Sequence, residues 1–190
     1  HMLQFKPGTD VAMLNALLHT IVNERLYDEQ YVAAHTEGFE ALKRNVQDYS
    51  PEAMAAVCGI DAATLRAVAR LYARAEAAMI FWGMGIAQHT HGTDNARCLI
   101  ALALITGQVG RPGTGLHPLR GQNNVQGASD AGLIPMALPD YRPVGDAVGR
   151  KVFEEAWGAK LDPERGLTVV EIINAILADQ IKAIHIMGEN

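Results

Sequence analysis

Eight residues in the second half of the chain gather an unusual number of hydrogen-bonding side chains. Residues 120–127 read Arg-Gly-Gln-Asn-Asn-Val-Gln-Gly, so one guanidinium and four side-chain amides lie between glycines. Asn and Gln each offer donors and an acceptor, Arg offers a rigid five-donor fork, and glycine lets the backbone approach a ligand closely. The segment therefore suits a polar, heterocyclic or carboxylate-bearing ligand, and the alternative is a hydrated surface loop.

Metal-ligating side chains are sparse by comparison. Cys58 and Cys98 lie inside apolar helical patterns, which favours two reduced core thiols over a disulfide. An iron–sulfur cluster or a structural zinc needs several thiolate or imidazole ligands close together, and the sequence offers no such set. His89 and His91 could bind a metal, but no acidic or sulfur ligand stands beside them in sequence. We therefore expect no metal site made by this chain alone.

Two short apolar runs that end in glycine are expected to bring loops to one edge of a sheet. Residues 77–82 lead into Gly83-Met84-Gly85, and residues 181–187 lead into Gly188. A short apolar run that ends in glycine is typical of a buried parallel strand. Ligands of open α/β sheets bind at the carboxyl ends of such strands. The pattern predicts a helix-rich α/β fold of the Rossmann-like, doubly wound type.

Helical spacing and capping residues account for most of the remaining chain. Thr9 opens an apolar repeat that runs to about Arg25, and Ser50-Pro51 and Asp61 mark two further helix starts. Further helices are predicted from Asp28, over 38–47, from Thr93 to Gly107, near 150–157 and over 168–178. Residues 107–150 show little periodicity and many glycines and prolines, which predicts a long functional loop.

Composition and motif spacing exclude several classes of protein. With 190 residues, 49% hydrophobic and 19% charged, the chain is of globular size. A formal net charge of −5 argues against nucleic acid or an anionic membrane as the main partner, and the apolar runs are too short to insert into a membrane. Gly83-x-Gly85 lacks the third glycine of a dinucleotide fingerprint, and residues 107–115 lack the Lys-Ser/Thr of a P-loop. NAD and ATP are therefore weakly supported as direct ligands.

Several motifs occur together in one order. They are Lys-Pro-Gly-Thr-Asp at 6–10, Gly-Met-Gly-x-x-Gln at 83–88, Leu-x-Thr-Gly-x-x-Gly-x-Pro-Gly at 104–113, the 120–127 segment, and Ile-Met-Gly-Glu-Asn at 186–190. The chain thereby resembles, over essentially its whole length, the alpha (large) subunit of formate dehydrogenases that depend on molybdopterin guanine dinucleotide. The resemblance implies an internal fragment of an oxidoreductase. In it, residues 1–2 are a cloning scar, 3–119 an α/β cofactor-binding segment, and 120–190 a loop-rich segment continuing into a second α/β cofactor-binding part.

The resemblance also implies which residues contact the cofactor: Gly8, Asp10, Met84, Gly85, Gln88, Gly121, Gln122, Gly188 and Glu189. Gly8 and Asp10 would bind the guanosine end, with the Asp10 carboxylate accepting from the guanine edge. The alternative for Asp10 is an acid favoured at a helix N-terminus, and both readings can hold together. Met84, Gly85 and Gln88 would face the pterin and phosphates, although Met84 could also be a core side chain. Gly121 and Gln122 would lie beneath the metal-bearing pterin.

Arg120 is the catalytic residue that the resemblance implies. Its planar fork would hold formate bidentately while the C–H bond faces the metal, and the molybdenum or tungsten centre would carry the redox chemistry to CO2. The alternative is a structural cation paired with an acid such as Asp130. The resemblance does not extend to a cysteine or selenocysteine metal ligand, its neighbouring histidine or a cluster-binding cysteine motif, because this chain has none.

The fragment alone is therefore expected to be inactive and to bind no cofactor, with the 4Fe-4S cluster elsewhere in the full-length enzyme. Its expected partners are formate or CO2, the remaining domains of the same polypeptide and electron-transfer subunits, in the cytoplasm. Two other classes compete: a fragment of another molybdopterin oxidoreductase, such as a nitrate reductase, and a non-redox nucleotide-binding module. Arg120 and the following Asn-Asn favour formate dehydrogenase over nitrate reductase.

Overall fold

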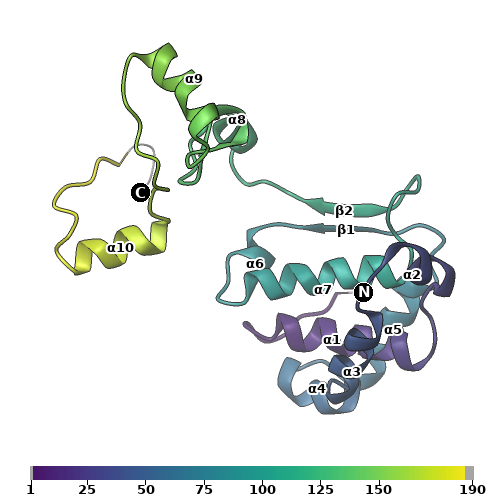
Figure 1. Cartoon of the computed structure of the whole chain (residues 1–190). Coiled ribbons are helices and arrows are strands. Elements are labelled where there is room, and N and C mark those ends of the chain that lie inside the picture. The colour runs from purple at the N-terminus through teal and green to yellow at the C-terminus, as the bar shows by residue number, and fades with distance from the viewer. Residues whose placement is uncertain (1, 187–190) are drawn as a thin grey trace. The chain divides into compact units, whose positions relative to one another are not determined.

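The chain folds into two compact units that divide after Gly121, as seen in a computed structural model that describes residues 2–186. The first unit carries most of the helices and a parallel strand pair, and the second carries α8 to α10 and a short antiparallel strand pair (Figure 1). No helix among residues 2–186 is both long enough and apolar enough to cross a membrane.

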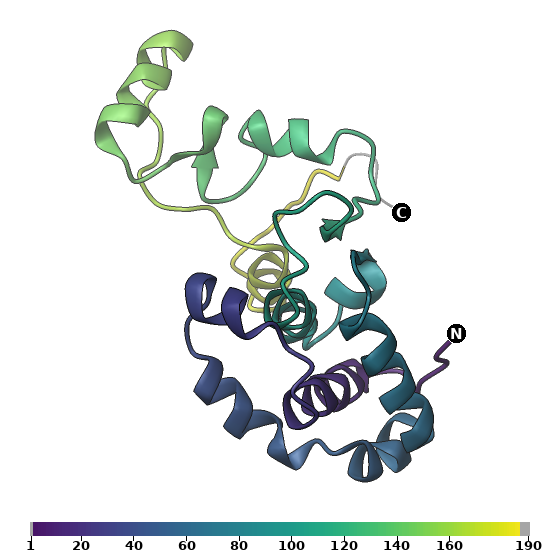
Figure 2. The ribbon, with the colours of Figure 1, turned by 90° about the vertical axis from the view of Figure 1, so that its right-hand side faces the viewer.

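Helix α1 (Asp10–Asn23) is the centre of the first unit. Helices α4 (Pro51–Cys58), α5 (Ala62–Ala73) and α7 (Gly92–Ile105) pack directly on it (Figure 2). Helix α2 (Glu29–His35) packs on α7, and α3 (Phe39–Asn45) leads into a 3-10 turn, Val46–Asp48, that contacts α1. The resulting core is built mainly from aliphatic side chains of α1 and α7, such as Leu18, Ile21 and Leu102.

Local capping explains where three of these helices begin, as the sequence predicts. The Ser50 hydroxyl accepts a hydrogen bond from the Ala53 N–H at 3.2 Å, with Pro51 at the first helical position. The carboxylates of Asp61 and Asp28 accept in the same way from the backbone N–H groups of Thr64 and Tyr31, at 2.8 and 2.9 Å. Each cap satisfies a donor that the first turn of a helix leaves unpaired.

The sheet of the first unit has two parallel strands, β1 (Met79–Trp82) and β2 (Gly115–Pro118), paired in register from Met79 opposite Gly115 to Trp82 opposite Pro118. Between them the chain passes through α6 (Met84–Ala87) and α7, so β1, the helices and β2 form one βαβ unit (Figure 1). Gln108, 2% exposed, fixes the start of this sheet: it accepts from the Ala78 N–H and donates to the Ala75 carbonyl, both at 2.9 Å.

Two sequence predictions about strands need correction. Strand β1 is confirmed, but β2 lies inside the stretch predicted to be a long loop. Residues 181–186 form no strand, while Met187 and Gly188 fall outside the described residues. The doubly wound sheet is therefore not found among residues 2–186, and the fold is a helix-rich α/β arrangement with small sheets. An apolar segment becomes a strand only where another strand pairs with its backbone, and 181–186 has no such partner among the described residues of its unit.

The second unit contains α8 (Val125–Asp130), the antiparallel pair β3 (Ala137–Leu138) and β4 (Arg142–Pro143), and helices α9 (Ala147–Trp157) and α10 (Val169–Leu177). A 3-10 turn, Pro139–Tyr141, joins the two strands. Helix α10 begins with a capping box, in which Glu171 accepts from the Thr168 N–H at 2.7 Å. Arg165 donates to both oxygens of the same carboxylate, which lowers the pKa of Glu171 to about 2.

Candidate functional site

The carboxyl ends of β1 and β2 bring together residues that are far apart in the sequence. The Leu119 N–H donates to the Trp82 carbonyl at 2.6 Å, which extends the pairing of the two segments beyond the strands. A Cβ placed on Gly121 would lie 3.2 Å from the Cε atom of Met84. Two of the residues expected to contact the cofactor therefore meet at this edge, the place where ligands of parallel sheets bind.

Met84 is not a core side chain, because half of it, 50%, is exposed at this edge. The neighbouring Gly85 and Gln88 are exposed as well, and a Cβ on Gly85 would contact nothing within 4 Å. Packing within the chain therefore does not require a glycine at position 85. The open space in front of it is available to a ligand.

Arg120 lies between Leu119 and Gly121 at the same edge, and its side chain is exposed. Within the described part of the first unit, its guanidinium makes no hydrogen bond and no ion pair. Another arginine of this unit, Arg111, is bound in place, donating to the carbonyls of Gly107 and Glu76 at 3.1 Å. The Arg120 guanidinium thus has no hydrogen-bond or ion-pair partner in the described part of its unit. The pairing of Arg120 with Asp130 would join the two units and stays an alternative hypothesis.

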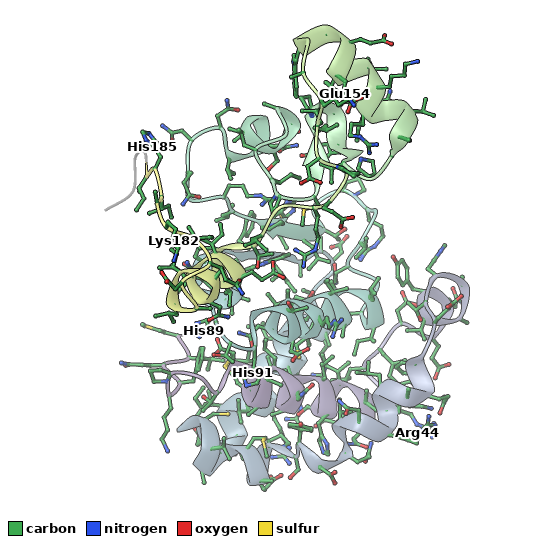
Figure 3. All side chains as sticks on the ribbon, turned by 60° about the vertical axis from the view of Figure 1, so that its left-hand side comes forward. Arg44, His89, His91, Glu154, Lys182 and His185 are labelled. Atoms are coloured by element: carbon green, nitrogen blue, oxygen red, sulfur yellow. The ribbon has the colours of Figure 1, made fainter. Side chains whose placement is uncertain are left out.

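A second part of the site is a cavity of about 360 Å³ between the start of α1 and the start of α7. Gly8 and Asp10 line one side, and His89, His91 and Asn95 line the other. Figure 3 shows the two histidines on the loop that leads into α7. Residues 83–91, which include α6, therefore begin at the sheet edge and end at this cavity, so one short segment joins the two parts.

Asp10 is the buried charge of this cavity. Its side chain is only 4% exposed, and it makes no hydrogen bond or ion pair with another described residue. Burying an unpaired carboxylate is costly, and the N-terminus of α1 offsets part of that cost. Beside it, Gly8 has φ +80°, a conformation that favours glycine. The carboxylate remains free to accept hydrogen bonds from a ligand in the cavity.

The remaining candidate residues fall in different places. Gln122 is exposed at the start of the second unit, and Gly188 and Glu189 lie outside the described residues. Among residues 2–186 no group of three or more His, Cys, Asp or Glu side chains could hold a metal ion. The Nε2 atom of His89 instead lies 2.6 Å from the Gly85 carbonyl oxygen. Sequence reasoning missed Asn95, whose role depends on contacts that no local pattern reveals.

Both cysteines are free and buried, as the sequence predicts. Burial raises the pKa of the Cys98 thiol to about 11, and burial also raises the pKa of Cys58. Thiols of this kind are core side chains with little thiolate at neutral pH. They are therefore poor metal ligands and poor nucleophiles.

Comparison with known proteins decides the family. The molybdopterin oxidoreductase family matches this chain over residues 1–190. The chain belongs to this family. The alpha subunit of an F420-dependent formate dehydrogenase from Methanocaldococcus jannaschii is 46% identical over 188 residues, which are 99% of this chain and 28% of that subunit. Formate dehydrogenase H of Escherichia coli is 41% identical over 189 residues, 99% of this chain and 26% of that protein.

Other similar proteins carry different names. A nitrate reductase of Synechocystis is 32% identical over 191 residues, covering 99% of this molybdopterin oxidoreductase chain and 27% of that protein. The structure of acetylene hydratase from Pelobacter acetylenicus superposes with a TM-score of 0.56 at 30% identity, over 57% of this chain and 15% of that one. The chain thus spans between a quarter and a third of the length of the curated relatives named here.

The family implies a molybdopterin cofactor with molybdenum or tungsten, and the residues of this oxidoreductase chain fit such a group. A buried carboxylate, Asp10, lacks a partner in the cavity. At the sheet edge, Gly85 faces open space and Arg120 is uncommitted within its unit. A large polar cofactor such as a molybdopterin needs hydrogen-bond donors, acceptors and closely approaching backbone of this kind.

Proposed function

We propose that the protein containing this chain is a molybdenum- or tungsten-dependent formate dehydrogenase. In this proposal the chain binds molybdopterin guanine dinucleotide and orients formate for oxidation to CO2, one proton and two electrons. Two formate dehydrogenases among the relatives, at 46% and 41% identity over 99% of this chain, support it. The observation that carries it is the exposed Arg120, uncommitted within its unit and next to Gly121 and Met84 at the sheet edge.

Each part of the site has one task in this proposal. Asp10, buried in the cavity, accepts hydrogen bonds from the guanine edge, with Gly8 beside it. Met84, Gly85 and Gln88 contact the pterin and phosphate side. Gly121 and Gln122 lie under the pterin, and Gly188 and Glu189 complete the cofactor contacts. Outside this chain, the proposal requires other domains of the polypeptide to supply the metal ligand and the 4Fe-4S cluster.

Arg120 performs the substrate step of this chain. Formate offers only its carboxylate to a protein, and two parallel N–H donors of a guanidinium fix both of its oxygens at once. Fixing the carboxylate also fixes the direction of the C–H bond, which is the orientation that the reaction needs. When bound, the metal centre supplies the two-electron chemistry.

The test measures steady-state formate oxidation by the full-length protein, with metal and pterin content determined for each variant. Arg120→Lys keeps the charge but loses the fork, so it should raise KM and lower kcat while the cofactor stays bound. Arg120→Ala should cost on the order of 2–4 kcal/mol, or roughly 30- to 1000-fold in kcat/KM per bound metal. Arg44→Ala, at an exposed arginine on α3 (Figure 3), is the matched control and should leave kcat/KM unchanged.

The same assay separates the second candidate function. The nitrate reductase relative favours nitrate as substrate, and nitrate is also a planar anion that an arginine fork can hold. If the protein turned over nitrate and not formate, the proposed function would therefore change from formate dehydrogenase to nitrate reductase. Normal formate kcat/KM per bound metal in Arg120→Ala would instead remove the substrate role of Arg120 and leave it a structural cation.

A further inference from the structure

The short turn that carries Met84 and Gly85 is held from behind by a side chain of α7. Helix α6 has only four residues, and the carbonyl of Gly83 accepts the N–H groups of Ile86 and Ala87 at 3.1 and 3.2 Å. The carbonyls at the other end of so short a helix find few backbone donors. The Nδ2 atom of Asn95 donates to the Ile86 carbonyl at 2.9 Å.

A glycine lets α7 come close enough for this bond. A Cβ placed on Gly92 would lie 1.9 Å from the carbonyl oxygen of Ala87 and 2.6 Å from its carbonyl carbon. No side chain fits there without moving the backbone, so the first turn of α7 rests directly on the end of α6. Asn95, three residues further along α7, then reaches the Ile86 carbonyl.

Stability alone does not explain an asparagine at this place. The residue is 1% exposed, and its Oδ1 atom is buried without a hydrogen-bond partner in the described structure. A buried acceptor that is left unpaired lowers the stability of the fold, a cost that an apolar side chain of similar volume would avoid. Residues that lower stability in this way are concentrated at functional sites.

Asn95 also lines the cavity that contains Asp10, so it borders both parts of the site. A second contact on the same turn comes from His89, whose Nε2 atom lies 2.6 Å from the Gly85 carbonyl oxygen. The exposed His89 ring is solvent-accessible, whereas Asn95 is enclosed. Of the two contacts, the one from Asn95 is therefore the one shielded from water.

We propose that Asn95 is a positioning residue for the cofactor. By fixing the Ile86 carbonyl it sets the direction of the turn over residues 84–88, and thereby the approach of Met84, Gly85 and Gln88 to the pterin and phosphate side. Gly92 makes this possible by letting α7 approach the turn. The inference rests on the proposed function, because it requires that these residues contact the cofactor.

The test uses the full-length protein with three variants. Asn95→Leu removes the donor and the unpaired acceptor, and Asn95→Asp keeps the shape but replaces the donor by an oxygen. Asn15→Leu is the matched control, because Asn15 is 5% exposed on α1 and lies outside the site, where its Oδ1 accepts from the Cys98 thiol at 3.8 Å. Pterin content per polypeptide is measured by fluorescence after acid oxidation, beside the thermal midpoint and the amide hydrogen exchange of residues 84–88 without cofactor.

Loss of one orienting hydrogen bond should lower pterin content at limiting cofactor by about tenfold in both Asn95 variants. The amides of residues 84–88 should exchange faster, while the thermal midpoint of Asn95→Leu falls no further than that of Asn15→Leu. Wild-type pterin content in both Asn95 variants would overturn the inference alone. A pterin loss matched by Asn15→Leu would overturn it too, since it would follow general destabilisation. Wild-type protein that binds no pterin would overturn the proposed function and this inference together.

Discussion

The two parts of the candidate site differ in how firmly this chain holds them. The cavity at the start of α1 and α7 contains a carboxylate that is 4% exposed and an asparagine that is 1% exposed, both on helices packed into the core. The segment after β2 carries an exposed arginine with no partner in its own unit. In the first unit, the cavity side chains are therefore held within packed helices, whereas the arginine at the sheet edge is not held by a partner.

The elements behind the two parts explain this difference. Helices α1 and α7 satisfy their own backbone groups and need only bury an apolar face, so they form a stable base for Asp10 and Asn95. Among the described residues, no third strand pairs with the two-stranded sheet, and one of its faces carries the exposed Phe81, whose ring stacks on that of His117 with centroids 5.0 Å apart. In the segment that leaves this sheet, the Leu119 N–H is bonded to the Trp82 carbonyl, but the Arg120 side chain next to it is exposed.

The largest expected effect concerns Cys98, which lies one helical turn beyond Asp94 on α7. It tests whether α1 and α7 are packed as firmly as the comparison requires. Burial raises its pKa to about 11, so at pH 8 the folded protein should react with iodoacetamide at least about 100-fold more slowly at Cys98 than the unfolded chain does. Peptide mass spectrometry after timed alkylation, with and without urea, measures this ratio. Equal rates in the two conditions would show that α1 and α7 are not packed as described.

Asp10→Ala and Arg120→Ala should separate the two parts of the site, because one variant should impair cofactor binding and the other should impair turnover. Loss of a hydrogen bond to a charged group in the cavity should weaken cofactor binding by about 10- to 100-fold, while kcat per bound metal stays unchanged. Arg120→Ala should instead leave cofactor binding unchanged and lower kcat per bound metal. Cofactor titration with metal analysis distinguishes the two, and a lower kcat per bound metal in Asp10→Ala would contradict the separation.

Asp10→Ala should also change thermal stability little, because the carboxylate has no partner among the described residues and its removal relieves a buried charge. The thermal midpoint of the cofactor-free protein measures this. A large loss of stability would mean that Asp10 acts mainly through the N-terminus of α1.

The smallest expected effect concerns pH and an ion pair at the C-terminal end of α1, the end opposite to the cavity. Arg70 on α5 donates to both oxygens of Glu24, the residue that follows α1, at 2.7 and 2.8 Å. The hydrogen bond from Arg70 lowers the pKa of Glu24. A lowered pKa in the folded state means that the pair stabilises the fold above about pH 4.3 and loses this contribution as the pH falls further.

Because the pair is partly exposed, its loss should lower the thermal midpoint by less than about 5 °C. The measurement is the thermal midpoint between pH 6 and pH 3 for wild type and for Arg70→Gln. The difference between the two proteins should shrink as the pH falls. A difference that stays constant over this range would contradict a role for the Glu24 charge.

The sequence by itself determined three helix starts and the first strand, although α7 begins at Gly92, whereas the pattern predicts Thr93 as its cap. Ser50 and Asp61 cap their helices as predicted, and Asp28 caps the helix predicted to begin there, because each cap is a bond between residues three positions apart. The apolar run before Gly83 likewise predicts β1, since the run and the glycine that ends it are neighbours. The motifs at 6–10, 83–88 and 120–127 indicated the family, which the match over residues 1–190 shows.

Only the tertiary structure decided the features that depend on distant residues. Residues 115–118 look like loop in sequence, yet they form β2 because β1 offers its backbone groups 36 positions away in the register. Residues 181–186 look like a strand, yet no strand among residues 122–186 pairs with them. Asn95 gives no local signal, because its significance comes from the Ile86 carbonyl, which α7 reaches only where Gly92 leaves room. Helix capping and apolar periodicity depend on residues that are close in sequence. Strand pairing and close packing depend on which distant segments the whole fold brings together.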